Sequence, residues 1–227
     1  MEKRALIVGA TGLVGGELVK LLLERRDYSK VTVVARRKLE IKHSRLDQLV
    51  VDFEKLDELP GELLRDADVY CALGTTRKKA GSKEKFRRVD YHYPLELGRL
   101  AVRYGANRLL VVSALGADEG SVFFYSKVKG ELERDLQQLP LKALHIFQPS
   151  LIVGDRQEYR FVEVAAYKIT GLLAFLFRGK LKKYGPISAK EIAESMLAAA
   201  ILEGAAPKIV SSGEMPSLAA LLRNGQS

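Results

Sequence analysis

The 227-residue sequence predicts an α/β fold with a Rossmann-type, doubly wound parallel sheet and a small C-terminal segment on the substrate side. Short apolar runs rich in β-branched residues alternate with longer segments of helical periodicity, and a glycine-rich turn follows the first run. Parallel strands need helical crossovers, so this alternation favours a parallel sheet over an antiparallel one. The expected strands cover residues 5–8, 31–35, 49–52, 69–73, 109–113 and 143–147.

Helical periodicity separates these strands. In the first expected helix, residues 13–25, Val14, Leu18, Leu21 and Leu22 follow the i, i+4, i+7, i+8 spacing of one apolar face. Further helices are expected over residues 90–104, 125–137 and 189–202, and a last strand over residues 208–210.

No repeat, low-complexity tract or linker interrupts the chain, which predicts one domain over residues 1–227. Residues 1–149 are expected to bind a cofactor, and residues 150–227 are expected to cover the substrate side. In this second part Ser188 is the expected N-cap of a helix, because Glu191 follows three residues later as in a capping box.

The chain has 37 basic and 28 acidic residues, and its formal charge of +9 suits an anionic small ligand, nucleic acid or an acidic membrane surface. The basic residues are scattered and no nucleic-acid-binding motif accompanies them, so no nucleic-acid partner is expected. Cys71 is the only cysteine and lies in an apolar run, which predicts a buried thiol, a reducing compartment and a cytoplasmic location. The N-terminus begins with a strand pattern and lacks the apolar region of a signal peptide.

The longest apolar stretch, residues 161–177, is interrupted by Glu163 and Lys168, which predicts a buried helix rather than a membrane span. Basic residues follow it at 178–183, so peripheral contact with a membrane surface is the weaker alternative. The three histidines lack metal-ligand spacing and carboxylate company, and no metal is expected.

The turn after the first strand reads GATGLVG, residues 9–15. Gly9 permits a sharp turn, Gly12 lets the backbone approach a pyrophosphate, and Gly15 allows close packing of helix on strand. The following helix directs its N-terminal N–H groups at the phosphates. Because the glycines lie between a strand and an amphipathic helix, they predict a dinucleotide site.

Arginines follow the second strand, where an NAD site usually has an acidic residue. Arg36 and Arg37 come directly after Ala35, and guanidinium groups match the oxygens of a 2′-phosphate. This favours NADP(H), with a solvated basic loop as the alternative. The ends of the next two strands supply residues expected beside the adenine and a ribose respectively: Asp52 and Phe53, then Leu73 and Gly74.

A candidate catalytic set follows. Ser113 is expected to end the fifth strand, and Tyr125 and Lys129 share one helix face at i, i+4. A nearby ammonium favours the phenolate, so Lys129 is expected to lower the pKa of Tyr125 and to bind the nicotinamide ribose. Tyr125 then exchanges a proton with the substrate oxygen, which the Ser113 hydroxyl orients. A Tyr-x-x-x-Lys pair also occurs by chance, so an ordinary aromatic at a helix start is the alternative.

These residues together resemble the short-chain dehydrogenase/reductase superfamily in its atypical or extended branch, and more narrowly the Tat-interacting-protein oxidoreductase family. The resemblance covers roughly residues 4–160 through the segments GATGLVG, VTVVARRK, VDFEKL, LGTTRKKAG, Val89-Asp90, SALGAD, YSKVKGELE and PSLIVGDRQEYR. It implies that Tyr125 is the proton donor and acceptor. It also implies that NADP(H) is bound by Thr11, Gly12, Leu13, Val14, Leu73, Gly74, Tyr125, Lys129, Ile152 and Arg160.

Two departures from the superfamily pattern leave a second function open. The Asn-Asn-Ala-Gly motif of the main branch is replaced by residues 72–75, Ala-Leu-Gly-Thr, and the helical Asn of the proton relay is missing. The expected function is an NADP(H)-dependent oxidoreductase acting on a small carbonyl or alcohol. The alternative is a non-catalytic, NADP(H)-sensing regulatory protein.

Overall fold

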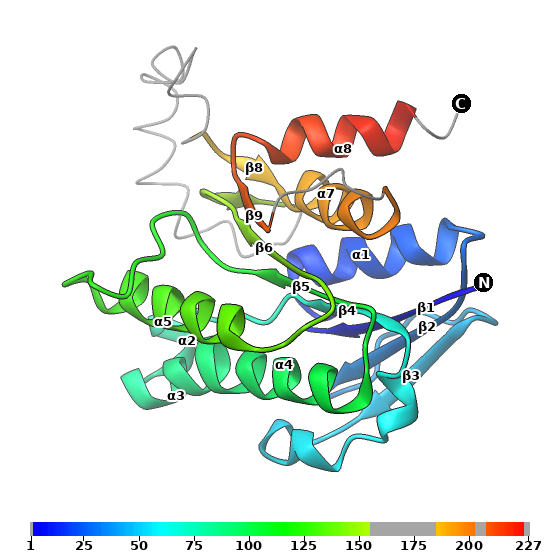
Figure 1. Cartoon of the computed structure of the whole chain (residues 1–227), viewed down its shortest axis with the longest axis horizontal. Coiled ribbons are helices and arrows are strands. Elements are labelled where there is room, and N and C mark those ends of the chain that lie inside the picture. Colours follow the sequence, from blue (N-terminus) through cyan, green and yellow to red (C-terminus); the bar gives the residue numbers. More distant parts are fainter. Residues whose placement is uncertain (1, 155–184, 203–207, 225–227) are drawn as a thin grey trace.

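The computed structural model describes residues 2–154, 185–202 and 208–224. Its centre is a seven-stranded parallel sheet in the order β3-β2-β1-β4-β5-β6-β9 (Figure 1). This order, in which the chain turns back beside β1, is that of the doubly wound dinucleotide-binding fold and confirms the predicted fold class. The strands are β1 (Lys3–Val8), β2 (Tyr28–Ala35), β3 (Leu46–Val50), β4 (Ala67–Cys71), β5 (Arg108–Val112), β6 (Leu144–Gln148) and β9 (Ile209–Ser211).

Helices cover both faces of this sheet (Figure 1). Alternate residues of β1 join different cores: Ala5 and Ile7 pack with the helices of one face, whereas Leu6 and Val8 pack with those of the other. A strand that is apolar on both sides is typical of a parallel sheet buried between helical layers. The helices are α1 (Leu13–Glu24), α7 (Ala189–Ile201) and α8 (Met215–Asn224) on one face, and α4 (Tyr93–Tyr104) and α5 (Phe124–Gln138) on the other.

The C-terminal part of the described chain belongs to the same sheet. Strand β9 pairs with β6, and α7 packs against α1. The expected capping box is confirmed, because the Ser188 hydroxyl accepts from the Glu191 N–H at 3.1 Å and Glu191 accepts from the Ser188 N–H at 3.2 Å. A second, two-stranded sheet joins β7 (Ile152–Val153) to β8 (Ile187–Ser188). The division into a cofactor part and a substrate part stays a prediction.

The third strand lies earlier than predicted, at Leu46–Val50 rather than residues 49–52. The physical reason is a side-chain cap. The Asp52 carboxylate accepts from the Glu54 N–H at 3.0 Å and begins the 3-10 segment η1 (Phe53–Glu58), which draws the chain away from the sheet. A second short 3-10 turn, η2 (Gly61–Leu63), follows before β4.

The crossover from β4 to β5 holds more helix than residues 90–104. The Thr76 and Ser82 hydroxyls accept from backbone N–H groups three residues on, and each caps a short helix. These are α2 (Arg77–Ala80) and α3 (Lys83–Arg87), and α3 continues through the π-helical segment η3 (Arg88–His92) into α4. The π-helical turn places Asp90 in the interior.

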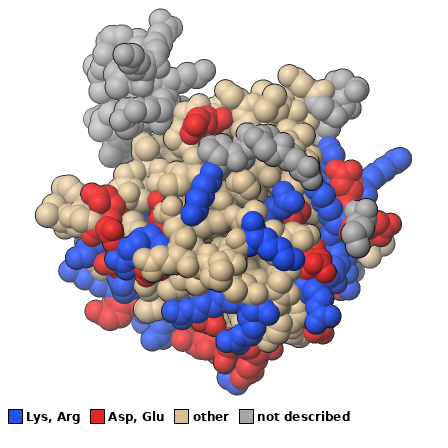
Figure 2. Space-filling model, in the orientation of Figure 1, with Lys and Arg blue, Asp and Glu red and all other residues tan. Residues whose placement is uncertain are grey.

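Charged side chains are intermixed on the visible face of the molecule. Figure 2 shows Lys and Arg interleaved with Asp and Glu over its lower half, rather than gathered into one basic patch. Within the described ranges, no helix is long and apolar enough to cross a bilayer. The apolar stretch 161–177 and the basic run 178–183 lie outside those ranges.

Candidate functional site

The glycine turn between β1 and α1 has a shape that only glycine allows. Gly9 has a φ of +96°, and a Cβ there would lie 2.5 Å from the backbone of Ala72. A Cβ on Gly15 would lie 2.3 Å from the Gly9 carbonyl oxygen. Gly12 is the N-cap of α1 and makes no side-chain capping bond, so the helix N-terminus is open to an external anion. This turn fits a dinucleotide pyrophosphate.

The two arginines expected at a 2′-phosphate lie near this turn. Strand β2 ends at Ala35, and Arg36 and Arg37 follow it as exposed side chains. Because β2 pairs in parallel with β1, the arginines leave the sheet at the same edge as the glycine turn. Their position suits the adenosine end of a dinucleotide.

The residues expected beside the adenine and a ribose differ in exposure. Phe53 is buried, and its ring meets Tyr93 edge-on at 5.6 Å between centroids, so the core accounts for its packing. Asp52 is exposed beside it. Strand β4 ends at Cys71 rather than residue 73, so Leu73 and Gly74 lie in the turn that follows, with Leu73 buried and Gly74 exposed. Their contacts with a cofactor stay predictions.

Cys71 itself matches the expectation of a buried, inert thiol. It is fully buried, and burial raises the pKa of its thiol to about 11.

Lys129 is buried and ion-paired. Its Nζ lies 2.8 Å from Oδ1 of Asp90, with side-chain exposures of 3% and 1%. The other oxygen of Asp90 accepts from the Thr75 N–H at 2.9 Å, which ties the turn after β4 to helix α5. Burial lowers the pKa of Lys129, but the charges of Asp90 and Tyr125 outweigh it and raise that pKa. Lys129 is therefore an ammonium ion at neutral pH.

Tyr125 lies one turn before Lys129 on α5 and is 41% exposed. Its ring packs against Phe86 of α3 at 5.7 Å between centroids. Burial raises the pKa of Tyr125, the Lys129 charge lowers it, and Asp90 raises it again, so the balance is a raised pKa. The expectation of a lowered value is therefore wrong, because burial and Asp90 outweigh the lysine.

Ser113 follows β5, which ends at Val112, one residue earlier than predicted. It is 5% exposed, and its hydroxyl donates to Oε1 of Glu133 on α5. Glu133 also accepts from Nε2 of Gln148 on β6 at 2.8 Å. Burial raises the pKa of Glu133 despite these hydrogen bonds and the Lys129 charge.

Of the two expected contacts after residue 149, Ile152 lies in β7 and Arg160 lies outside the described residues. The end of this strand approaches the glycine turn, because a Cβ on Gly154 would lie 3.2 Å from the Leu13 side chain. In the described parts of the chain, no group of His, Cys, Asp or Glu is arranged to hold a metal ion.

Sequence reasoning missed Asp90 and Glu133, the two buried carboxyl groups that partner the expected catalytic residues. Glu133 had a signal: it follows Lys129 by four residues, so Tyr125, Lys129 and Glu133 form one stripe on α5. Asp90 had a signal only in the family resemblance, which includes Val89-Asp90, because its burial depends on the π-helical turn.

Comparison with known proteins identifies the family. A sequence profile described as NAD(P)H-binding matches residues 9–201, and Protein HTATIP2 of Rattus norvegicus is 41% identical over 175 residues, or 76% of this chain and 72% of that protein. The chain belongs to the HTATIP2-like family of atypical short-chain dehydrogenase/reductases. A fungal member, the mitochondrial protein FMP52 of Eremothecium gossypii, is 31% identical over 224 residues, covering 94% of this chain and 96% of its own.

Two solved structures show the same fold. MoeE5, solved with UDP-glucose and NAD, aligns with a TM-score of 0.67 at 16% identity over 97% of this chain and 82% of its own. A UDP-glucose 4-epimerase from Thermotoga maritima, solved with UDP-glucose, aligns with a TM-score of 0.65 at 17% identity over the same shares. At these identities the likeness concerns the fold alone.

The names of the family members correct one expectation. Several fungal FMP52 proteins are named mitochondrial, including those of Lodderomyces elongisporus and Debaryomyces hansenii. The predicted cytoplasmic location is contradicted by these names. That prediction rested on a single buried cysteine, and a reduced thiol does not distinguish one reducing compartment from another.

Proposed function

We propose that this protein is an NADP(H)-dependent oxidoreductase that interconverts a small carbonyl compound and its alcohol. One observation carries the proposal: the buried Lys129 ammonium lies one helical turn from the partly exposed Tyr125. A buried ion pair is weak evidence for stability, since apolar packing serves as well, and perturbed ionisable groups gather at functional sites. This arrangement therefore supports a role in binding and proton transfer.

The residues at the carboxyl edge of the sheet fit the cofactor. The N–H groups of residues 12–14 at the open end of α1 would bind the pyrophosphate. Arg36 and Arg37 would bind the 2′-phosphate through charge-assisted hydrogen bonds. When bound, NADPH supplies the hydride.

Tyr125 is the proposed proton donor in the reduction direction. Its raised pKa keeps the phenol protonated at neutral pH, which is the form that donates to a carbonyl oxygen. Lys129 has three N–H donors and Asp90 occupies one, so the others are available to the nicotinamide ribose. The Lys129 charge also stabilises the phenolate left after proton transfer, and Ser113 orients the substrate oxygen.

Calorimetric titration with NADPH and NADH tests the cofactor. Each charge-assisted hydrogen bond contributes about 1.5–3 kcal/mol, so Arg36→Ala and Arg37→Ala should each weaken NADPH binding by about 10–100-fold. NADH binding should change little. Lys42→Ala removes the same charge from a nearby exposed position and serves as the matched control. A wild-type protein that ignores NADPH, or prefers NADH, contradicts the proposal.

Turnover is tested separately by single-turnover oxidation of NADPH with a panel of small aldehydes and ketones. The rate should exceed that of Tyr125→Phe. If NADPH binds tightly and no carbonyl is reduced faster than in the variant, the protein is instead the NADP(H)-sensing regulator. Capture of a partner that depends on NADPH would then support that second function, which the missing relay Asn favours.

A further inference from the structure

A buried polar cluster lies behind Ser113. Both carboxylate oxygens of Glu133 have partners, since Ser113 donates to Oε1 and Gln148 donates to Oε2. Glu133 is only 6% exposed. One of its two partners is thus the residue expected to contact the substrate oxygen, although Glu133 itself lies outside the proposed catalytic set.

Building on the proposed function, we propose that Glu133 is a positioning residue that decides whether Ser113 donates or accepts a hydrogen bond at the substrate oxygen. An ionised carboxylate can only accept, so it holds the Ser113 hydrogen and leaves the serine lone pairs for the substrate. A protonated carboxyl can donate to Oγ of Ser113 instead. The serine hydrogen is then free to point at a carbonyl.

Only the protonated form of Glu133 suits the reaction, in either direction. A carbonyl oxygen under reduction has no hydrogen and needs a donor, which Ser113 provides when Glu133 is protonated. An alcohol under oxidation gives its one hydroxyl hydrogen to Tyr125, so its oxygen also needs a hydrogen bond from Ser113. Glu133 therefore couples the rate of the reaction to pH without touching the substrate.

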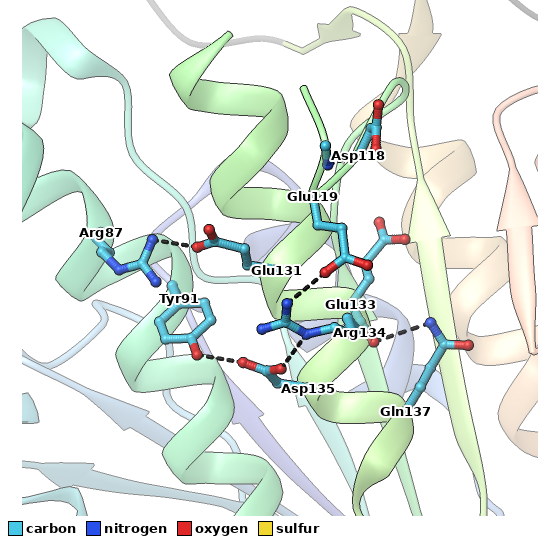
Figure 3. Close-up of polar contacts among 10 residues, drawn as sticks. Arg87, Tyr91, Asp118, Glu119, Glu131, Glu133, Arg134, Asp135 and Gln137 are labelled. Carbon is cyan, nitrogen blue, oxygen red and sulfur yellow. Dashed lines mark hydrogen bonds and ion pairs between the residues drawn. The ribbon is translucent and has the colours of Figure 1, made fainter. Parts of the chain in front are cut away.

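A surface hollow gives Glu133 a route to water. It has a volume of about 410 Å³ and lies between α5 and the loop that follows Ser113 (Figure 3). Glu133 is one of the residues that line it, so a proton has a short path from this residue to solvent. The hollow is lined by Ala117, Asp118, Glu119, Gly130, Glu133, Arg134, Gln137 and Gln138.

The charges around Glu133 come from α5 and from this loop. Burial raises its pKa, whereas hydrogen bonds from Ser113 and Gln148 and the charge of Lys129 lower it, and burial prevails. The pH at which Glu133 changes from its protonated to its ionised form therefore moves toward neutrality. Glu119 pairs with Arg134, which offsets the charge of that arginine (Figure 3). The charged groups that line the hollow beside Glu133 are Asp118, Glu119 and Arg134.

The first test follows the carboxyl directly, in the full-length protein without cofactor. Infrared spectra recorded across pH for wild type and Glu133→Gln should differ by one carboxyl band that titrates above the ordinary glutamate value of 4.5. Ser113→Ala removes a hydrogen bond that stabilises the carboxylate, so it should shift this midpoint upward. A midpoint at the ordinary value, or one that Ser113→Ala does not move, overturns the inference.

The second test follows the pH dependence of single-turnover reduction. Above the infrared midpoint the wild-type rate should fall about tenfold per pH unit, as the protonated fraction does. The side-chain amide introduced by Glu133→Gln can accept from Gln148 and donate to Ser113 at every pH. This variant should therefore lose the pH dependence, and its rate should exceed that of wild type above the infrared midpoint.

Glu131→Gln is the matched control. Glu131 lies on the same helix, and its carboxylate pairs with Arg87 of α3 at 2.5 Å (Figure 3). Its pH profile should follow wild type. If the reduction rate of Glu133→Gln falls with pH in parallel with that of wild type, the role of Glu133 is merely structural and the inference is overturned. A wild type that reduces no carbonyl contradicts the proposed function, and the infrared titration of wild type and Ser113→Ala then decides the inference alone.

Discussion

Replacing Asp90 with Asn should destabilise the protein strongly, because it leaves the Lys129 ammonium buried without its counter-charge. The pair is 2.8 Å apart and its side chains are 3% and 1% exposed. Removing one partner of such a pair costs about 3–5 kcal/mol. This cost has an upper limit, because the buried lysine can instead lose its proton and become neutral. Deprotonating a lysine of ordinary pKa 10.5 at pH 7 costs about 5 kcal/mol, at 1.36 kcal/mol per pH unit.

Urea unfolding of the cofactor-free protein at pH 7 measures this loss. Thermal unfolding is a second measurement of the same loss. For a chain of this size its midpoint should fall by about 6–20 °C, at 2–4 °C per kcal/mol. Glu17→Gln is the matched control, because Glu17 pairs with Lys20 at 2.7 Å but both are partly exposed, and its loss should stay below about 1 kcal/mol. The double variant Asp90→Asn/Lys129→Met removes the unpaired charge and should recover about half the loss or more.

The pH dependence provides a further check. In wild type the folded pKa of Lys129 is raised, so its contribution is complete below the unfolded value and is lost only as pH rises through the folded value. In Asp90→Asn the folded pKa falls below the unfolded one, so the unfolded state binds more protons. The variant should therefore regain stability between pH 7 and pH 9, by up to about 2.7 kcal/mol. An Asp90→Asn protein within about 1 kcal/mol of wild type at pH 7 refutes this reasoning.

Three further predictions concern the turn, a helix cap and the tyrosine. Gly15→Ala places a Cβ 2.3 Å from the Gly9 carbonyl oxygen, so calorimetry should find NADPH binding weakened by about tenfold or more, whereas Gly16→Ala, whose Cβ has 3.6 Å of room, should bind normally. Equal affinities would contradict the close packing. Ser188→Ala removes the capping box of α7 and should lower the free energy of unfolding in urea by about 1 kcal/mol, and an unchanged midpoint would contradict this. Tyr125→Phe should keep NADPH affinity within about twofold while single-turnover reduction slows by about 100-fold or more, and an undiminished rate would exclude Tyr125 as the proton donor.

The strands and the main helices were predictable from the sequence because their burial is regular. Strand β1 is apolar on both faces and α1 is apolar on one face. Such patterns can be read from the order of apolar residues along the sequence. The boundary of β3 was missed because one side chain, Asp52, captures a backbone N–H and starts a new turn. Boundaries set by a single capping bond leave no periodic signal, although the Thr76 and Ser82 caps are of the residue types that favour N-caps.

The candidate site was predictable in its residues and less so in its electrostatics. The spacing of Tyr125 and Lys129 indicates one helix face, and the lysine charge does lower the tyrosine pKa. The opposing effects of burial and of Asp90 could not be predicted. Asp90 reaches Lys129 only through a π-helical turn 39 residues earlier in the chain, and an acidic residue inside a helical segment is usually exposed.

The pairing of β7 with β8 has a consequence for how this family can diversify. Ile152 lies opposite Ile187, so the described residues on the two sides of the stretch 155–184 are held next to one another. The cost of closing a loop grows slowly with its length once its ends are fixed together. Changes in the length of the intervening stretch, residues 155–184, should therefore cost the seven-stranded sheet little through loop closure.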